Sequence, residues 1–130
     1  MENIKKGQFN EQIRERTIRM AVEIHQMLVN LKVSPVTRPI VNQVIRSSSS
    51  VASNYRASTR SWSDAEFYAK ICIVVEEIDE TQFWLEYLER ITILGRAKSN
   101  KLFDEVDELV RLFTSIKSKM KEKVNLSKME

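Results

Sequence analysis

Apolar side chains recur along the chain at intervals of three and four residues, in four long segments separated by short polar breaks. This spacing places the apolar side chains of each segment on one face of an α-helix. The pattern predicts helices over residues 11–31, 39–57, 64–94 and 100–123. Four amphipathic helices with short connections predict an all-α, antiparallel up-down four-helix bundle that forms a single domain over residues 1–130.

Local signals mark where these helices begin and end. Asn10 is the expected N-cap of the first helix, and the two prolines, Pro35 and Pro39, separate the first helix from the second. Residues 63–66 read Ser-Asp-Ala-Glu, a capping box in which the serine and glutamate side chains satisfy backbone amides at the start of the third helix. Gly95 is the expected stop of that helix.

The third helix is apolar on two sides. Its main stripe, from Phe67 to Leu88, faces the predicted core. A second stripe lies about 100° around the helix and comprises Ile73, Trp84, Tyr87 and Ile91. A helix that is apolar over so much of its circumference is usually buried from more than one side. We expect the second stripe to be an oligomer interface, and a wide core face within one bundle is the alternative.

Composition matters mainly through what it excludes. Two glycines and two prolines in 130 residues are too few for the frequent turns of a sheet protein. The single cysteine, Cys72, excludes an internal disulfide and a cysteine-based zinc cluster. No apolar stretch follows the N-terminal residues, and no run reaches the roughly 18 apolar residues of a membrane span. We therefore expect a soluble, cytoplasmic protein that has no membrane partner.

Charge is distributed unevenly along the chain. Residues 1–60 carry ten Lys and Arg against four Asp and Glu, residues 61–90 carry two against eight, and residues 91–130 carry nine against six. Two basic regions and an acidic centre would either attract a polyanion or pair with one another.

The second helix carries a polar stripe in which arginines alternate with hydroxyl and amide side chains at the spacing of one helix face. The guanidinium group matches phosphate oxygens in both charge and geometry. The stripe and the first helix together supply the candidate nucleic-acid-binding residues, which are Arg38, Arg46, Arg56, Arg60, Arg14, Arg16 and Arg19. The alternative is that these arginines form salt bridges with the acidic third helix, within one chain or between subunits.

The sequence predicts no catalytic residues, no metal site and no cofactor. The single histidine, His25, has no glutamate at the offset that a di-iron bundle requires. Carboxylates at residues 76–80 and 104–108 are of the type that binds Mg²⁺ in all-helical nucleotide pyrophosphatases. With Val74 and Ile78 facing the core, most carboxylates of residues 76–80 point away from the core. A Mg²⁺-dependent nucleotide hydrolase is therefore the least favoured hypothesis.

Three segments carry a family resemblance when taken together. They are residues 46–57 (Arg-Ser-Ser-Ser-Ser-Val-Ala-Ser-Asn-Tyr-Arg-Ala), 63–67 (Ser-Asp-Ala-Glu-Phe) and 76–86 (Glu-Glu-Ile-Asp-Glu-Thr-Gln-Phe-Trp-Leu-Glu). With these segments, the chain resembles the four-helix-bundle family of 23S rRNA-intervening-sequence proteins over about residues 10–120. Many members carry Glu-Gly or Glu-Ala after the asparagine segment, where this chain has Ala57 and Ser58.

The resemblance implies a homopentameric ring, in agreement with the second apolar stripe of the third helix. The chain also resembles the accessory subunit of diversity-generating retroelements, a basic pentameric bundle that engages nucleic acid and a reverse transcriptase. We therefore expect a non-enzymatic, oligomeric bundle that binds RNA or DNA through its basic surfaces. The alternative is a subunit that assembles with another protein and has no role in nucleic-acid binding.

Overall fold

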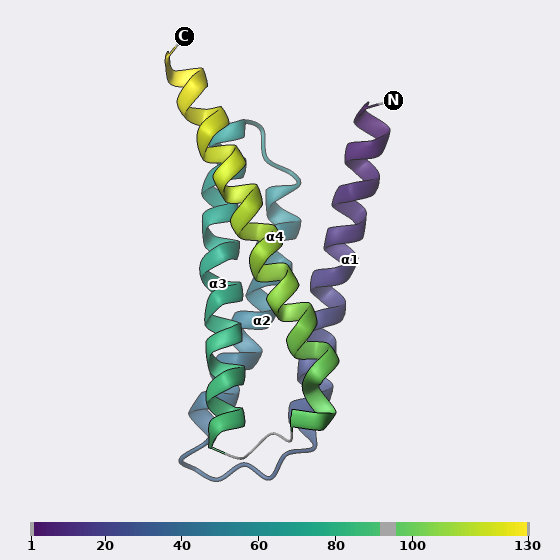
Figure 1. The fold of residues 1–130 in the computed structure, drawn as a ribbon, viewed down its shortest axis with the longest axis vertical. Coiled ribbons are helices and arrows are strands. Elements are labelled where there is room, and N and C mark those ends of the chain that lie inside the picture. Colours follow the sequence, from purple (N-terminus) through teal and green to yellow (C-terminus); the bar gives the residue numbers. More distant parts are fainter. Residues whose placement is uncertain (1, 92–95, 130) are drawn as a thin grey trace.

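The computed structural model describes residues 2–91 and 96–129 and confirms an all-α four-helix bundle (Figure 1). The four helices are α1 (Glu2–Val29), α2 (Arg38–Ser58), α3 (Asp64–Arg90) and α4 (Arg96–Met129). The start of α1 and the end of α4 lie at one end of the molecule, and the α1–α2 connection lies at the other. None of the helices in the described part of the chain is long and apolar enough to cross a membrane.

The first and last helices are longer than the apolar pattern predicts. The prediction that Asn10 caps the first helix is wrong, because α1 begins at Glu2 and Asn10 lies inside it. Likewise α4 begins at Arg96 rather than residue 100, and it continues to Met129 rather than ending at residue 123. Residues 6–9 and 125–129 are exposed. A helical turn that packs against no neighbour needs no apolar stripe, so the pattern ends before the helix does.

The predicted bounds of α2 and the start of α3 agree with the structure to within one residue. The capping box is present: the Ser63 hydroxyl accepts a hydrogen bond from the amide of Glu66 at 3.1 Å. The Glu66 carboxylate reaches back to the amide of Trp62, at 3.2 Å, rather than to that of the cap residue. At its other end α3 stops at Arg90, and the expected stop at Gly95 lies outside the described residues.

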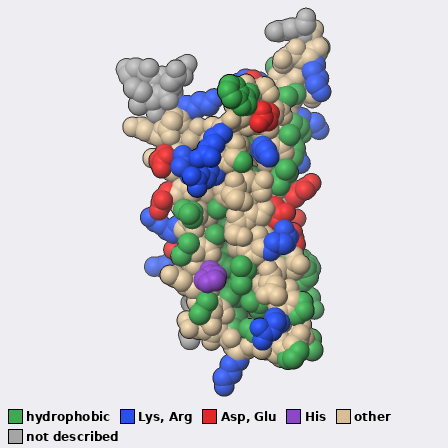
Figure 2. All heavy atoms as spheres, turned by 180° about the vertical axis from the view of Figure 1, so that it is seen from behind, with side chains coloured by type: hydrophobic (Ala, Val, Ile, Leu, Met, Phe, Trp, Pro, Cys, Tyr) green, Lys and Arg blue, Asp and Glu red, His purple; other side chains and the backbone are tan. Residues whose placement is uncertain are grey.

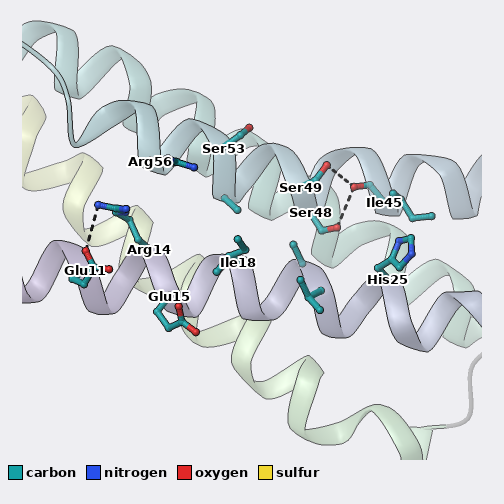
Figure 3. Close-up of a pocket in the computed structure, with 13 residues that line it drawn as sticks. Glu11, Arg14, Glu15, Ile18, His25, Ile45, Ser48, Ser49, Ser53 and Arg56 are labelled. Carbon is teal, nitrogen blue, oxygen red and sulfur yellow. Dashed lines mark hydrogen bonds and ion pairs between the residues drawn. The ribbon is translucent and has the colours of Figure 1, made fainter.

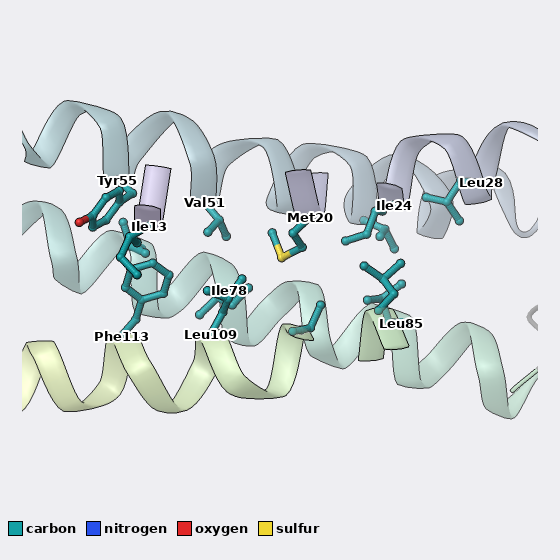
Figure 4. Close-up of a cluster of buried hydrophobic side chains, with 14 of the residues drawn as sticks. Ile13, Met20, Ile24, Leu28, Val51, Tyr55, Ile78, Leu85, Leu109 and Phe113 are labelled. Atoms are coloured by element: carbon teal, nitrogen blue, oxygen red, sulfur yellow. The ribbon is translucent and has the colours of Figure 1, made fainter. Parts of the chain in front are cut away.

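All four helices contribute to one central apolar layer (Figure 4). The predicted stripes supply most of it, as Met20 and Ile24 of α1, Ile78 of α3 and Leu109 of α4 are almost completely buried. Burial of an aliphatic side chain of this size stabilises the fold by about 1.5–3 kcal/mol. α2 packs most extensively on α3, whereas α1 packs on α2 and touches α4 only slightly. The α1 helix therefore forms one open side of the bundle.

Two aromatic rings close the core near the end that holds the chain termini. Tyr55 of α2 and Phe113 of α4 are 1% and 0% exposed, and their ring centroids lie 5.5 Å apart. The Tyr55 hydroxyl donates a hydrogen bond to Oδ1 of Asn10 at 3.3 Å. Burial raises the pKa of Tyr55 to about 12, and the nearby positive charge of Arg14 partly offsets this rise.

The raised pKa of Tyr55 makes the stability of the fold sensitive to alkaline pH. The unfolded chain loses the phenol proton near the ordinary pKa of 10.0, while the folded chain keeps it until about 12. Stability should therefore be lost as pH rises from 10 towards 12, by about 1 kcal/mol between pH 9 and pH 11. Urea unfolding of the wild type and of Tyr55→Phe at both pH values would measure this loss. The free energy of unfolding of the wild type, minus that of Tyr55→Phe, should be lower at pH 11 than at pH 9, and a difference that does not change with pH would contradict the assignment.

A small polar contact lies within the apolar layer between α2 and α3. The Thr81 hydroxyl donates to the Ser47 hydroxyl at 2.9 Å, and both side chains are fully buried. The serine segment of α2 remains helical, and the hydroxyls of Ser47 and Ser48 bond to carbonyl oxygens of their own helix one turn earlier, each at 3.3 Å. These small side chains allow α2 to lie close against α3.

Candidate nucleic-acid interface

Arg46, at the centre of the predicted arginine stripe, is held by the acidic third helix. Its guanidinium lies 3.1 Å from the Glu77 carboxylate and 2.6 Å from that of Glu80. The hydrogen bond from Arg46 lowers the pKa of Glu80 below its ordinary value, and the same bond raises the pKa of Arg46. At this position the structure agrees with the alternative that the arginines form salt bridges with the third helix, since the Arg46 guanidinium is already paired with two carboxylates.

The three candidate arginines of α1 are also paired. Arg16 lies 2.5 Å from a carboxylate oxygen of Glu105 and 3.1 Å from one of Glu108, so it joins α1 to α4. Arg14 pairs with Glu11 at 3.3 Å and Arg19 pairs with Glu15 at 3.5 Å, each within α1. Exposed pairs within one helix contribute only about 0.3–0.5 kcal/mol, so Arg14 and Arg19 can readily exchange their carboxylate for another anion. Arg16 is the more firmly held of the three.

The remaining three candidates, Arg38, Arg56 and Arg60, are exposed. Within the described ranges, no carboxylate lies at ion-pair distance from any of them. Arg38 begins α2 at one end of the bundle, whereas Arg56 belongs to the last turn of α2 and Arg60 follows that helix. The predicted arginine stripe therefore has two kinds of position. Its central arginine is paired with carboxylates, whereas the arginines at its two ends have no carboxylate partner among the described residues.

A groove of about 570 Å³ runs between α1 and α2 (Figure 3). Its apolar floor includes Ile18 and Val22, which are 52% and 47% exposed. At one end, Arg14 of α1 and Arg56 of α2 line opposite walls. Sequence reasoning named both arginines but did not place them together. The hydroxyl groups along the α2 wall bond to their own helix, so the two guanidinium groups are the cations that this end offers to an anion.

The same end of the molecule holds a second hollow, of about 330 Å³, beside the α2–α3 connection. Lys6 of α1 and Lys123 of α4 line it, and Lys123 lies 3.5 Å from the Asp64 carboxylate. Figure 2 shows the opposite side from Figure 1, with hydrophobic side chains beside the single histidine, His25, with one cluster of Lys and Arg side chains towards the end of the chain termini, and with other Lys and Arg side chains along the rest of this face. Cations from three helices therefore lie around one end of the bundle.

The second stripe of α3 is accessible in the single chain. Ile73, Tyr87 and Ile91 are 38%, 41% and 37% exposed, and Trp84 is half-buried against the core. The ring centroids of Trp84 and Tyr87 lie 5.6 Å apart, and the Trp84 indole donates to Glu80 at 3.3 Å. Sequence reasoning missed Phe83, which is 54% exposed and packs its ring against Trp84. Its position four residues before Tyr87 is the signal that could have added it to the stripe.

Acidic side chains do not converge on a cation site in the residues that the structure places. Among them, no group of three or more His, Cys, Asp or Glu side chains could hold a metal ion. Glu77 and Glu80, the carboxylates nearest to the core edge of α3, both face Arg46.

The fold and the site define a class of protein: an all-α bundle with an arginine-edged groove between its first two helices. The chain belongs to the 23S rRNA-intervening sequence protein family, whose model matches residues 10–115. It is also similar in fold to the crystal structure of a protein with unknown function from the S23 ribosomal protein family of Bacteroides thetaiotaomicron VPI-5482. That match has 24% identity and a TM-score of 0.72, and it covers 84% of this chain and 97% of the other. The chain has no significant match among curated proteins.

Proposed function

We propose that this chain is a non-enzymatic subunit that binds RNA or DNA through the basic end of the α1–α2 groove. The observation that carries the proposal is that Arg56 and Arg60 are exposed without a carboxylate partner in the described part of the chain. Arg14 lies across the groove from Arg56 and is held only by an exposed pair. Arginines in such positions can form bidentate bonds to phosphate without breaking the bonds that join the helices.

The proposed interface is narrower than the full arginine stripe. Arg46 and Arg16 each bridge two helices, so their recruitment by phosphate would remove contacts that hold α2 to α3 and α1 to α4. Arg38 has no carboxylate partner among the described residues, but it lies at the opposite end of α2 from Arg56. We therefore assign binding chiefly to Arg14, Arg56 and Arg60, with Arg19 and Arg38 at the margins.

We further propose that the bundle is antiparallel with up-down order and assembles into a homopentameric ring through the second stripe of α3. The exposed ring cluster of Phe83, Trp84 and Tyr87 supports such an interface, because interfaces between subunits are rich in aromatic side chains. A ring would repeat the basic groove once in each subunit. Several grooves that bind one strand together would raise the overall affinity without any new contact in a single subunit.

Removal of the two unpaired arginines should reduce the dependence of RNA binding on salt concentration. The double variant Arg56→Ala/Arg60→Ala should weaken binding of a fluorescein-labelled 20-nucleotide RNA, measured by anisotropy between 50 and 300 mM KCl. If each arginine contacts one phosphate of each bound strand, the slope of log K against log salt should fall by about 1.4 for every subunit that contacts the strand.

The double variant Arg90→Ala/Arg111→Ala is a matched control, because it removes the same two charges from exposed positions on α3 and α4. This control should keep the wild-type slope. An equal loss in both variants would show a general effect of net charge and would contradict the assigned site. Wild-type protein that binds neither RNA nor DNA at 50 mM KCl would favour the alternative, a subunit that assembles with another protein, for which the exposed face of α3 is the supporting observation.

A further inference from the structure

Trp62, in the connection between α2 and α3, presents its indole to solvent. The side chain is 94% exposed, more than any other large hydrophobic residue in the part of the chain that the structure describes. The connection lies at the same end of the molecule as the start of α1 and the end of α4 (Figure 1). A large aromatic ring that contributes nothing to the core and remains in water has the character of a contact surface for a ligand.

The backbone around Trp62 is held in place on both sides. The amide of Ser61 donates to the Ser58 carbonyl at 3.1 Å, and the amide of Trp62 donates to the Glu66 carboxylate at 3.2 Å. Ser63 then caps α3. A ring on a fixed backbone loses less conformational entropy when it binds a ligand than a ring on a loose one.

Positive charge surrounds the exposed ring. Lys6 and Lys123 line the same hollow as Trp62, and Arg60 precedes it by two residues. Asp64 and Glu66, the two carboxylates in the first turn of α3, are engaged with Lys123 and with the Trp62 amide respectively. Within the described part of the chain, Lys6 and Arg60 therefore remain available for an anion.

We infer that Trp62 is a stacking platform for an unpaired base, and that the ligand of this end of the bundle is single-stranded nucleic acid. This inference rests on the proposed nucleic-acid function and names its substrate class. A base offers its flat face to an indole only where it is not stacked in a duplex. Lys6 and Arg60 contact the phosphates that flank the stacked base. Stacking on an aromatic side chain is sequence-tolerant, so the platform accepts any base and selects for single strands.

The inference is tested with two single strands and one duplex: a 12-nucleotide oligouridylate, a 12-nucleotide oligothymidylate and a 12-base-pair RNA. Loss of one stacked base weakens binding roughly 5- to 150-fold. Trp62→Ala should show such a loss for both single strands and a change of less than about twofold for the duplex. Trp62→Phe keeps a flat ring and should recover most of the affinity. A preference for oligouridylate over both oligothymidylate and oligodeoxyuridylate would identify RNA as the ligand through its 2′-hydroxyl, because oligodeoxyuridylate differs from oligouridylate in the sugar alone.

Intrinsic tryptophan fluorescence gives a second measurement of oligonucleotide binding at Trp62. The chain has two tryptophans, so Trp84→Phe leaves Trp62 as the sole source of tryptophan emission. Oligouridylate should quench this emission in proportion to the bound fraction. Since Trp62 is almost fully exposed, Trp62→Ala should keep the wild-type melting temperature, which separates loss of stacking from loss of fold.

The possible failures are distinguishable. Wild-type protein that binds no oligonucleotide at 50 mM KCl overturns the proposed function and this inference with it. Arginine-dependent binding that is unchanged in Trp62→Ala, or weakened equally for strand and duplex, overturns the inference alone. A smaller particle mass for Trp62→Ala with unchanged oligonucleotide affinity makes Trp62 a contact between subunits, and this result also overturns the inference.

Discussion

Replacing Phe113 with alanine is expected to lower the free energy of unfolding by about 3–5 kcal/mol, the range for removal of a buried aromatic ring. The Phe113 side chain is completely buried, and its ring packs against that of Tyr55. Truncation leaves a cavity between α2 and α4 that the surrounding helices can fill only in part. Urea unfolding followed by circular dichroism measures the loss, with all proteins at one concentration because assembly adds to stability.

Phe9→Ala is the matched control for this prediction. It removes the same atoms from α1, at a side chain that is 44% exposed. Its effect should stay within about 1 kcal/mol, since most surface substitutions have small effects. A Phe113→Ala protein that unfolds at the same urea concentration as Phe9→Ala would contradict the packing described for this end of the core.

Replacing Tyr87 with arginine is expected to break the proposed ring into smaller particles. Tyr87 belongs to the exposed aromatic face of α3. If this face is buried between subunits, the guanidinium introduced at position 87 would lose its contact with solvent and gain no anion in return, which opposes assembly. Light scattering of the wild type should give five times the chain mass of 15.2 kDa, and the variant should fall towards the single-chain mass. Tyr87 suits this test better than Trp84, whose indole donates to Glu80 and packs against the core.

Val36→Arg is the control for the assembly prediction. Val36 lies in the α1–α2 connection and is 81% exposed, so it gains the same charge outside the α3 face. The control should keep the wild-type mass. Wild-type protein that scatters as a single chain would refute the ring, and a Tyr87→Arg variant that keeps the wild-type mass would place the interface elsewhere.

The number of helices and the identity of the core could be predicted because both follow from the local period of the sequence. Ile24, Ile78 and Leu109 occupy predicted stripe positions and are completely buried. The cap at Ser63 could be predicted for the same reason, since all of its partners lie within four residues. The ends of α1 and α4 could not, because their terminal turns carry no apolar stripe that would reveal them.

The state of each arginine depends on contacts that no local pattern contains. Arg46 meets Glu80 across 34 positions of the sequence, and Arg16 meets Glu105 across 89. These pairs follow from how far one helix is shifted along another, which the period of a single helix does not specify. The same limit explains why the sequence could not join Arg14 to Arg56, since only the packing of α1 against α2 brings them to one groove.

The exposure of Trp62 could not be predicted from the sequence either. In the sequence it stands between Ser61 and the capping Ser63, and an aromatic residue there could equally have folded back as a hydrophobic staple onto α3. The structure instead turns it outward.

The hydroxyl contact between Ser47 and Thr81 has a consequence for the uniqueness of the fold. Aliphatic layers alone tolerate a shift of one helix along its neighbour by a full turn, because one apolar layer resembles the next. Such a shift would separate the two hydroxyls, at a cost of about 0.5–1.5 kcal/mol for the lost hydrogen bond between the helices. It would also part Arg46 from one of its two carboxylates, because Glu77 and Glu80 lie one helical turn apart on α3. The α2–α3 interface thus contains polar contacts that set the register of the two helices, and these contacts favour one alignment over alignments shifted by a turn.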